Sequence, residues 1–108
     1  VDLNRVVILS KYKFENSVFK GENFLKDICK LKFIDEFTQG DGVTFSTIYS
    51  FKGLEAPIII LCDVEELDNR SSQLLNYVAI SRSKELLYIL LNENAYAQYE
   101  KNIMNKIL

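Results

Sequence analysis

Residues 43–62 read VTFSTIYSFKGLEAPIIILC, and this stretch decides the fold. It contains Val43–Tyr49, which mixes β-branched and aromatic residues as strands do, and the continuous apolar run Ile58–Leu61, and Val6–Leu9 is a second such run. Continuous apolar runs of this kind are typical of strands that are covered on both faces of a sheet. Pro57 disfavours a helical conformation at the residue before it, which favours a strand after it. The sequence therefore predicts three buried strands.

Helical and strand-like segments share the rest of the chain. Leu86–Leu91 is predicted to be a fourth buried strand, and Leu31–Phe37 a shorter one with Leu31, Phe33 and Phe37 at period two. A weak helix is predicted over Phe14–Cys29 and a turn at Gly40–Gly42. A second helix, capped by Ser71 or Ser72, is predicted to run through Ser81, with Leu74, Leu75, Val78 and Ala79 on one stripe. The last predicted element is an amphipathic helix over Ala95–Ile107, with Tyr96, Tyr99, Ile103 and Ile107 at helical spacing.

Buried strands separated by helices predict an α/β fold in which a parallel sheet is flanked by helices on both faces. Ligands of such sheets bind at the carboxyl ends of the strands. We therefore expect the ligand-binding loops to be those that follow Leu9, Thr47, Leu61 and Leu91.

The composition is that of one soluble domain, residues 1–108. The chain has no His, which excludes a His-based triad or zinc site, and its two Cys lack CxxC spacing, which favours a reducing cytoplasm. The longest apolar run, Ala56–Cys62, is too short to cross a membrane, and no signal peptide is visible. Because the chain begins with Val1, we expect it to be a piece of a longer protein.

Charge is unevenly distributed along the chain, although the net charge is only −2. Residues 34–68 carry one basic and eight acidic side chains, whereas the segments on either side are net positive. The net charge excludes a histone-like protein that binds nucleic acid through bulk positive charge. The positive segments are either solvated faces of separate elements or a surface that meets a polyanion.

Two motifs carry the chemistry. The first is Thr44–Glu55, TFSTIYSFKGLE, and the second is Leu75–Lys84, LNYVAISRSK. Together they resemble the fifth and sixth motifs of UvrD-like superfamily 1 DNA helicases, T-[IL]-H-x-x-K-G-L-E-F and Y-V-[AG]-[LIV]-[ST]-R-[AS]-[KR]. Val7–Lys13 occupies the place of the family's fourth motif. The resemblance implies the second RecA-like domain of such a helicase, a P-loop NTPase-type fold, with DNA repair as its biological context.

The resemblance implies that ATP contacts Gly53, Glu55, Arg82 and Lys11. Glu55 would bond a ribose hydroxyl, and Arg82 would be the catalytic arginine finger on the γ-phosphate, because its planar fork of donors suits a spreading negative charge. The family has an Arg in the fourth motif, where this chain offers either Lys11 or Lys13. The alternatives are a turn glycine at Gly53, a solvated carboxylate at a helix start for Glu55, and an Arg82 ion pair with Asp63 or Glu66.

The same resemblance implies that Thr47, Tyr49 and Ser50 bind single-stranded DNA. Hydroxyl groups bond phosphate oxygens, and an aromatic ring stacks on a base or sugar. Tyr49 stands where the family has His, so stacking is retained without the imidazole. The alternative for Tyr49 is a half-buried strand residue. Tyr77 is predicted to pack its helix against the sheet.

No G-x-x-x-x-G-K-[ST] loop occurs in the chain, so it lacks the element that cradles the β- and γ-phosphates. ATP with Mg²⁺ would be bound mainly by a preceding N-terminal RecA-like domain, the implied partner in the same polypeptide. The acidic side chains of residues 63–68 are ordinary carboxylates at a strand end, and no metal site is predicted there. The competing function is a non-catalytic RecA-like module that binds a nucleotide or a protein partner.

Overall fold

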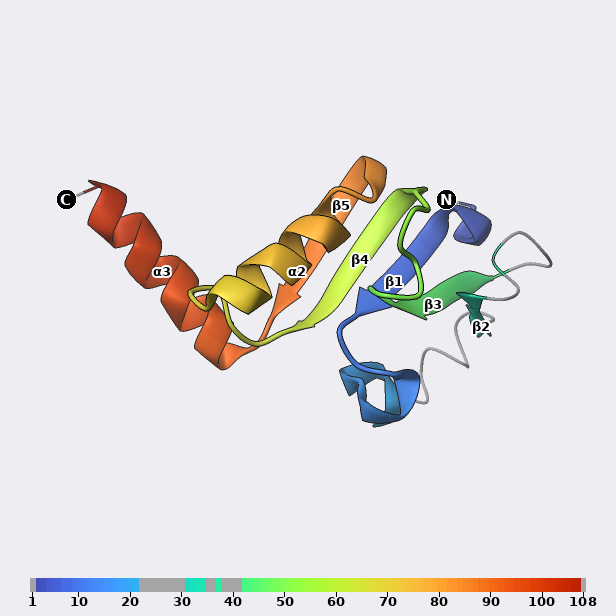
Figure 1. The fold of residues 1–108 in the computed structure, drawn as a ribbon, viewed down its shortest axis with the longest axis horizontal. Coiled ribbons are helices and arrows are strands. Elements are labelled where there is room, and N and C mark those ends of the chain that lie inside the picture. Colours follow the sequence, from blue (N-terminus) through green and yellow to red (C-terminus); the bar gives the residue numbers. More distant parts are fainter. Residues whose placement is uncertain (1, 22–30, 35–36, 38–41, 108) are drawn as a thin grey trace.

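The computed structural model describes residues 2–21, 31–34, 37 and 42–107, and within them a parallel sheet organises the chain (Figure 1). Its five strands lie in the order β2-β3-β1-β4-β5. The bounds of the elements in chain order are η1 Leu3–Arg5, β1 Val6–Ser10, η2 Phe14–Asn16, η3 Val18–Gly21, β2 Leu31–Phe33, β3 Val43–Thr47, β4 Ala56–Val64, α2 Arg70–Ile80, β5 Ser83–Leu91 and α3 Glu93–Ile107.

Every described strand pairing is parallel, which confirms the predicted α/β fold. β1 lies at the centre, and all five of its residues are buried. Alternate side chains of β1 enter two separate apolar clusters, since Val7 and Leu9 belong to one and Val6 and Ile8 to the other. The β-branched runs therefore form strands that are buried on both faces, as their composition predicted.

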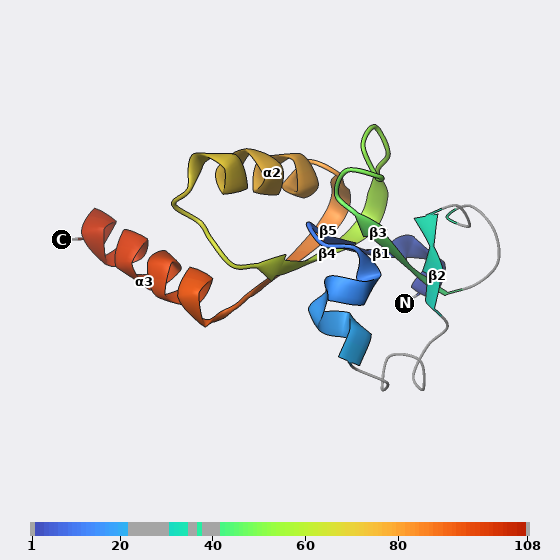
Figure 2. The same cartoon turned by 60° about the horizontal axis from the view of Figure 1, so that its bottom comes forward.

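The two faces of the sheet are covered by different kinds of helix (Figure 2). α2 lies on one face, where Ala79 is fully buried against β1 and β4. The short 3₁₀ helices η2 and η3 lie on the other, with Phe14 and Phe19 against its cluster. The predicted weak helix over residues 14–29 is thus two 3₁₀ turns as far as residue 21, and residues 22–30 lie outside the described part of the chain.

The predicted cap of α2 is wrong. Asn69 caps the helix in place of Ser71 or Ser72, because its Oδ1 accepts a hydrogen bond from the Ser72 N–H at 3.1 Å. Leu75, Val78 and Ala79 face the core as expected, but Leu74 is exposed. Tyr77 is 70% exposed, so the prediction that it packs the helix against the sheet is also wrong.

β5 is a strand where predicted, but it is not buried. It pairs only with β4, at the end of the sheet, and Leu86, Tyr88 and Leu90 are about half exposed. Only Leu87 and Leu91 of this strand pack against the core. α3 begins at Glu93 instead of Ala95 and extends away from the sheet (Figure 1), so that only Ala95 at its base is buried.

Two shorter predictions are partly confirmed. β2 covers only Leu31–Phe33, and Phe37 packs beside the core without belonging to the strand. Gly42 has φ +123°, a conformation that glycine adopts without strain and that fits the predicted turn. Gly40 and Asp41 lie outside the described residues.

Candidate functional site

The first motif links the two opposite edges of the sheet. Thr47 ends β3 at the carboxyl edge, and Ala56 begins β4 at the amino edge. The segment between them crosses the face of the sheet that carries α2, where Ile48 and Phe51 are buried in the core. From the strand registers, its two ends lie about 20 Å apart along the strands, at ~3.3 Å per residue.

The end of the first motif meets Arg82 at the amino edge. The Ala56 N–H, directly after Glu55, donates to the Arg82 carbonyl at 3.0 Å, which ties the start of β4 to the end of α2. Gly53 and Glu55 are exposed. Glu55 leads into a strand and not a helix, which removes the alternative of a helix-start carboxylate.

Gly53 needs glycine for its backbone conformation. Its φ is +83°, which side-chain-bearing residues rarely adopt, whereas a Cβ there would meet no atom within 4 Å. The space beside it is open, as a close approach of a ligand requires.

The Arg82 side chain is bonded to the protein through Nε, whereas its terminal nitrogens pair with no acidic side chain of the described residues. Nε donates to the Val78 carbonyl at 3.2 Å, a bond to one of the last carbonyls of α2. Among the residues that the structure describes, Arg82 forms no ion pair, and the alternative partners Asp63 and Glu66 lie toward the other end of β4. The terminal nitrogens of the fork are therefore not engaged by an acidic side chain of the described chain.

Thr47, Tyr49 and Ser50 lie at the carboxyl edge. The Ser50 N–H donates to Thr47 Oγ1 at 3.1 Å, so the first turn after β3 is closed by the threonine hydroxyl. Tyr49 is 69% exposed, which removes the alternative of a half-buried strand residue. Tyr49 and Ser50 are thus exposed to solvent, and Thr47 is half-buried beside them.

Lys11 is not brought to the other predicted ATP contacts. It follows β1 at the carboxyl edge, and its Nζ forms an ion pair with Glu65 at 2.8 Å. The registers place it about 23 Å along the strands from the Ala56–Arg82 bond, which exceeds the combined reach of the two side chains. Burial opposes the charge of Lys11, but its bonds to Glu65 and Tyr12 outweigh burial and raise its pKa.

Asp63, which the sequence predicts to be an ordinary carboxylate at a strand end, holds the loop after β1 in place. Asp63 accepts hydrogen bonds from Ser10 Oγ at 2.5 Å, Ser17 Oγ at 2.7 Å and the Val18 N–H at 3.0 Å. Its backbone has φ +58°, which is unfavourable for a residue with a side chain, although Asp tolerates it better than most. The strained aspartate therefore holds both ends of the loop over residues 10–18.

The protonation states around Asp63 follow from these contacts. Burial opposes ionisation of Asp63, but the hydrogen bonds from Ser10, Ser17, Val18 and Cys62 outweigh it and lower the pKa of the carboxyl group. Burial, with the adjacent charge of Asp63, raises the pKa of the Cys62 thiol to about 12. The thiol therefore stays protonated at neutral pH.

Replacing Asp63 by asparagine is expected to destabilise the fold by about 1–3 kcal/mol at pH 7, because three donors lose a charged acceptor. Asparagine tolerates a positive φ, so the change isolates the charge from the backbone strain. The folded-state pKa is lowered, so the stabilisation is present above the ordinary carboxyl pKa and is lost as pH falls through the lowered value. Urea unfolding at pH 7 and in acid measures this, and a difference between the two proteins that persists unchanged in acid would contradict it.

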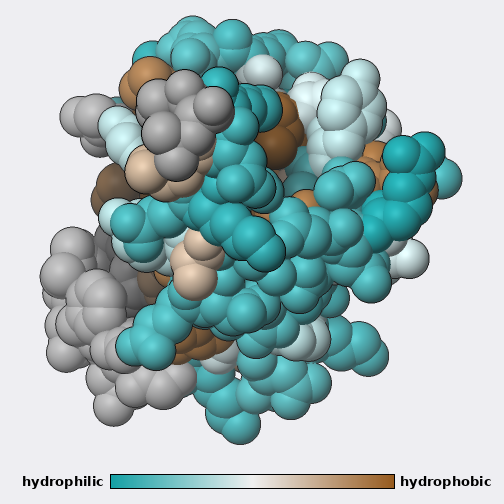
Figure 3. Space-filling model, turned by 90° about the vertical axis from the view of Figure 1, so that its left-hand side faces the viewer, coloured by the Kyte–Doolittle hydropathy of each residue, from teal (hydrophilic) through white to brown (hydrophobic). Residues whose placement is uncertain are grey.

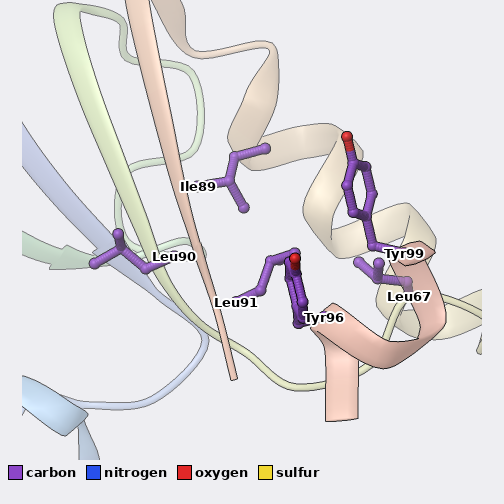
Figure 4. A pocket seen from close by; sticks show the side chains of 6 residues that line it. All are labelled: Leu67, Ile89, Leu90, Leu91, Tyr96 and Tyr99. Atoms are coloured by element: carbon purple, nitrogen blue, oxygen red, sulfur yellow. The ribbon is translucent and has the colours of Figure 1, made fainter. Parts of the chain in front are cut away.

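An apolar groove of about 560 Å³ lies between β5 and α3. Ile89 and Leu91 point from β5 toward Tyr96 and Tyr99, whereas the Leu90 side chain lies on the other side of the strand (Figure 4). The surrounding end of the molecule is mostly hydrophilic, with apolar side chains visible only in patches (Figure 3). None of the motif residues lines this groove.

The described residues contain neither a candidate metal site nor a membrane-spanning helix. Among them, no group of three or more Cys, Asp or Glu side chains is gathered so that it could hold a metal ion. No helix in the described part is long and apolar enough to cross a membrane.

Residues 42–90 match the family model of the UvrD-like helicase C-terminal domain. Over these residues the chain is similar to the UvrD-like helicase C-terminal domain, and the five-stranded parallel sheet is consistent with a RecA-like domain of that family. The matched segment contains the first motif and all of the second, which confirms the resemblance drawn from them.

Two bacterial helicases illustrate the similarity. The chain is 37% identical to the ATP-dependent DNA helicase PcrA of Staphylococcus epidermidis over 81 residues, which cover 62% of the chain and 11% of that protein. It is 36% identical to PcrA of Staphylococcus aureus over 81 residues, with the same coverage. The chain thus spans 11% of the length of these curated relatives.

Proposed function

We propose that this chain is the second motor domain of an ATP-dependent superfamily 1 DNA helicase or translocase. One observation carries the proposal. A single segment, residues 47–56, joins the half-buried Thr47 and the exposed Tyr49 and Ser50 at one edge of the sheet to Gly53, Glu55 and the Ala56–Arg82 backbone bond at the other. The similarity to PcrA supports the same function, since that relative is named as an ATP-dependent DNA helicase.

The amino edge supplies half of a nucleotide site. The open space beside Gly53, the exposed Glu55 carboxylate and the unpaired end of the Arg82 fork fit the ribose and γ-phosphate of ATP. Mg²⁺ and the other phosphates belong to a preceding RecA-like domain with a phosphate-binding loop, because the sequence here has none. Lys11, held by Glu65 at the opposite edge, is not part of this half-site.

The carboxyl edge supplies part of the track for single-stranded DNA. Thr47 and Ser50 offer hydroxyls to phosphate oxygens, and the exposed Tyr49 ring stacks on a base or sugar. In the intact helicase, ATP binding and hydrolysis close and open the cleft between the two motor domains. Alternating grip on the strand then converts these movements into translocation.

The 108-residue chain alone is expected to hydrolyse no ATP, with or without single-stranded DNA, because it lacks the loop that cradles the β- and γ-phosphates. It should bind single strands weakly, with a Kd on the order of 10⁻⁴ to 10⁻⁶ M that rises with salt. A phosphate-release assay and fluorescence anisotropy measure the two properties. ATP turnover that is abolished by a substitution within this chain, or submicromolar sequence-specific binding to duplex DNA at physiological salt, would contradict the proposal.

A further inference from the structure

The last strand of the sheet has an open edge. β5 pairs with β4, and no other strand of the described residues lies beside it. Edge strands in globular proteins are protected by charged side chains or prolines, because an open apolar edge pairs with other chains. β5 carries charges only at its start, Lys84 and Glu85, and the run Leu86–Leu91 is apolar. Six of its nine residues are exposed, so the edge lacks the usual protection.

The helix that follows is held to the domain by its polar side. Three amide side chains, spaced by four residues, contact the segment after β4, and they are Asn94, Gln98 and Asn102. Gln98 Nε2, for example, donates to Glu66 Oε1 at 2.8 Å. An amphipathic helix in a globular protein ordinarily packs with its apolar stripe. On α3, Tyr96 and Tyr99 lie instead on the side away from the amides, about half exposed, and line the groove (Figure 4).

We infer that this end of the domain binds a second copy of the same chain. The open edge of β5 pairs antiparallel with the same edge of the second copy, and the groove between β5 and α3 receives apolar side chains of the second strand. Such a two-fold contact is self-complementary, because the same surface is used on both copies. The inference goes beyond the proposed function, since no residue of the two motifs lines the groove.

The sequence of β5 favours one register for this pairing. A two-fold axis at Tyr88 places apolar side chains opposite each other across the two strands, Leu86 with Leu90 and Leu87 with Ile89. An axis one residue earlier would place the Glu85 carboxylate opposite an apolar side chain. An axis one residue later would place Leu86 opposite a polar one. The register with Tyr88 at the axis therefore keeps every pair near the axis apolar.

The exposed area of this surface is sufficient for a stable contact. Its large side chains are 41–54% exposed, and they are Leu86, Tyr88, Ile89, Leu90, Tyr96 and Tyr99. At about 100 Å² for each half-exposed large side chain, they offer roughly 600 Å². A standard interface buries about 800 Å² on each partner, of which about 60% is apolar. These side chains alone therefore supply the apolar area that a stable dimer needs.

Sedimentation equilibrium of the 108-residue chain, under reducing conditions, tests the inference. We expect a monomer–dimer equilibrium with a Kd on the order of 10⁻⁶ to 10⁻⁵ M. Tyr88→Lys should raise this Kd about tenfold or more, because two ammonium groups would face each other at the axis. Tyr77→Lys is the matched control, since Tyr77 is an exposed tyrosine of α2 that does not line the groove, and it should leave the Kd unchanged.

Cysteine substitutions test the register. Tyr88→Cys should form a disulfide between two copies on oxidation with diamide, since Cβ atoms directly opposite across two strands lie about 4.5–5.5 Å apart. Leu86→Cys alone should form none at that position, whereas a mixture of Leu86→Cys and Leu90→Cys should link the two variants. Peptide mapping identifies the bonded positions and distinguishes them from bonds to the native cysteines.

Thermal unfolding shows whether each variant is folded. A chain that is still monomeric at about 10⁻⁴ M would overturn the inference, and the groove would then receive a segment of a different protein. A dimer that persists unchanged in folded Tyr88→Lys would also overturn it, as would a dimer that is lost in folded Tyr77→Lys. A disulfide in Leu86→Cys alone, with none in Tyr88→Cys, would overturn the pairing about Tyr88.

Discussion

Replacing Arg82 by alanine is expected to lower kcat for DNA-stimulated ATP hydrolysis by about a hundredfold or more in an intact helicase that carries this domain. An arginine finger acts in the transition state, where charge spreads over the transferring phosphoryl group, so its loss lowers kcat more than it weakens ATP binding. The position is well defined for this role, because the Arg82 backbone is bonded to Ala79 and Ala56 and its Nε to Val78.

Arg82→Lys is the matched control for this prediction. Lysine keeps the charge but loses the planar fork, so little of the rate should return. The bond from Nε to a helix-end carbonyl contributes about 1 kcal/mol, so both variants should melt within a few degrees of the wild type. Steady-state kinetics, ATP affinity and thermal unfolding are measured together. A destabilised enzyme with near-normal kcat would show that Arg82 is structural.

Replacing Phe51 by alanine is expected to destabilise the 108-residue chain by about 3–5 kcal/mol. Phe51 is fully buried in the crossing segment, and its ring contacts Phe37 edge to face with centroids 5.2 Å apart. Alanine would leave a cavity beneath the segment that carries both halves of the first motif. Urea unfolding measures the change in the free energy of unfolding.

Phe51→Leu is the control for Phe51→Ala. Leucine fills most of the cavity, so the loss should be clearly smaller, and single-strand binding should stay close to that of the wild type. A loss below about 1 kcal/mol in Phe51→Ala would mean that the crossing segment is held by its backbone turns alone.

The central strands could be predicted from local composition. Composition alone could not show that the last strand lies at the edge of the sheet. Val6–Leu9 and Ile58–Leu61 are apolar on both faces and lie inside the sheet. Leu86–Leu91 is just as apolar, and yet its strand lies at the end of the sheet with six of its nine residues exposed. Strand order depends on contacts between distant segments, which periodicity along the chain does not encode.

The motifs predict candidate site residues, but they do not reveal how far apart these residues lie. The sequence favoured ligand loops at the carboxyl ends of the strands, and the structure puts Gly53, Glu55 and Arg82 at the opposite edge. It also favoured Lys11 for the phosphate contact, with Lys13 as a competitor. The difference between them depends on Glu65, more than fifty residues away in the chain, and no local pattern reveals that ion pair.

The buried ring of Phe51 makes the crossing segment a spacer of fixed length. The proposed DNA contact at one edge and the proposed nucleotide contact at the other are about 20 Å apart along the strands, and the segment between them is packed on the sheet. The distance between the two proposed contacts is therefore fixed by the packing of the domain. If the proposed function holds, this domain moves as a rigid body. The length of each step along DNA is then set by rotation of whole domains against each other.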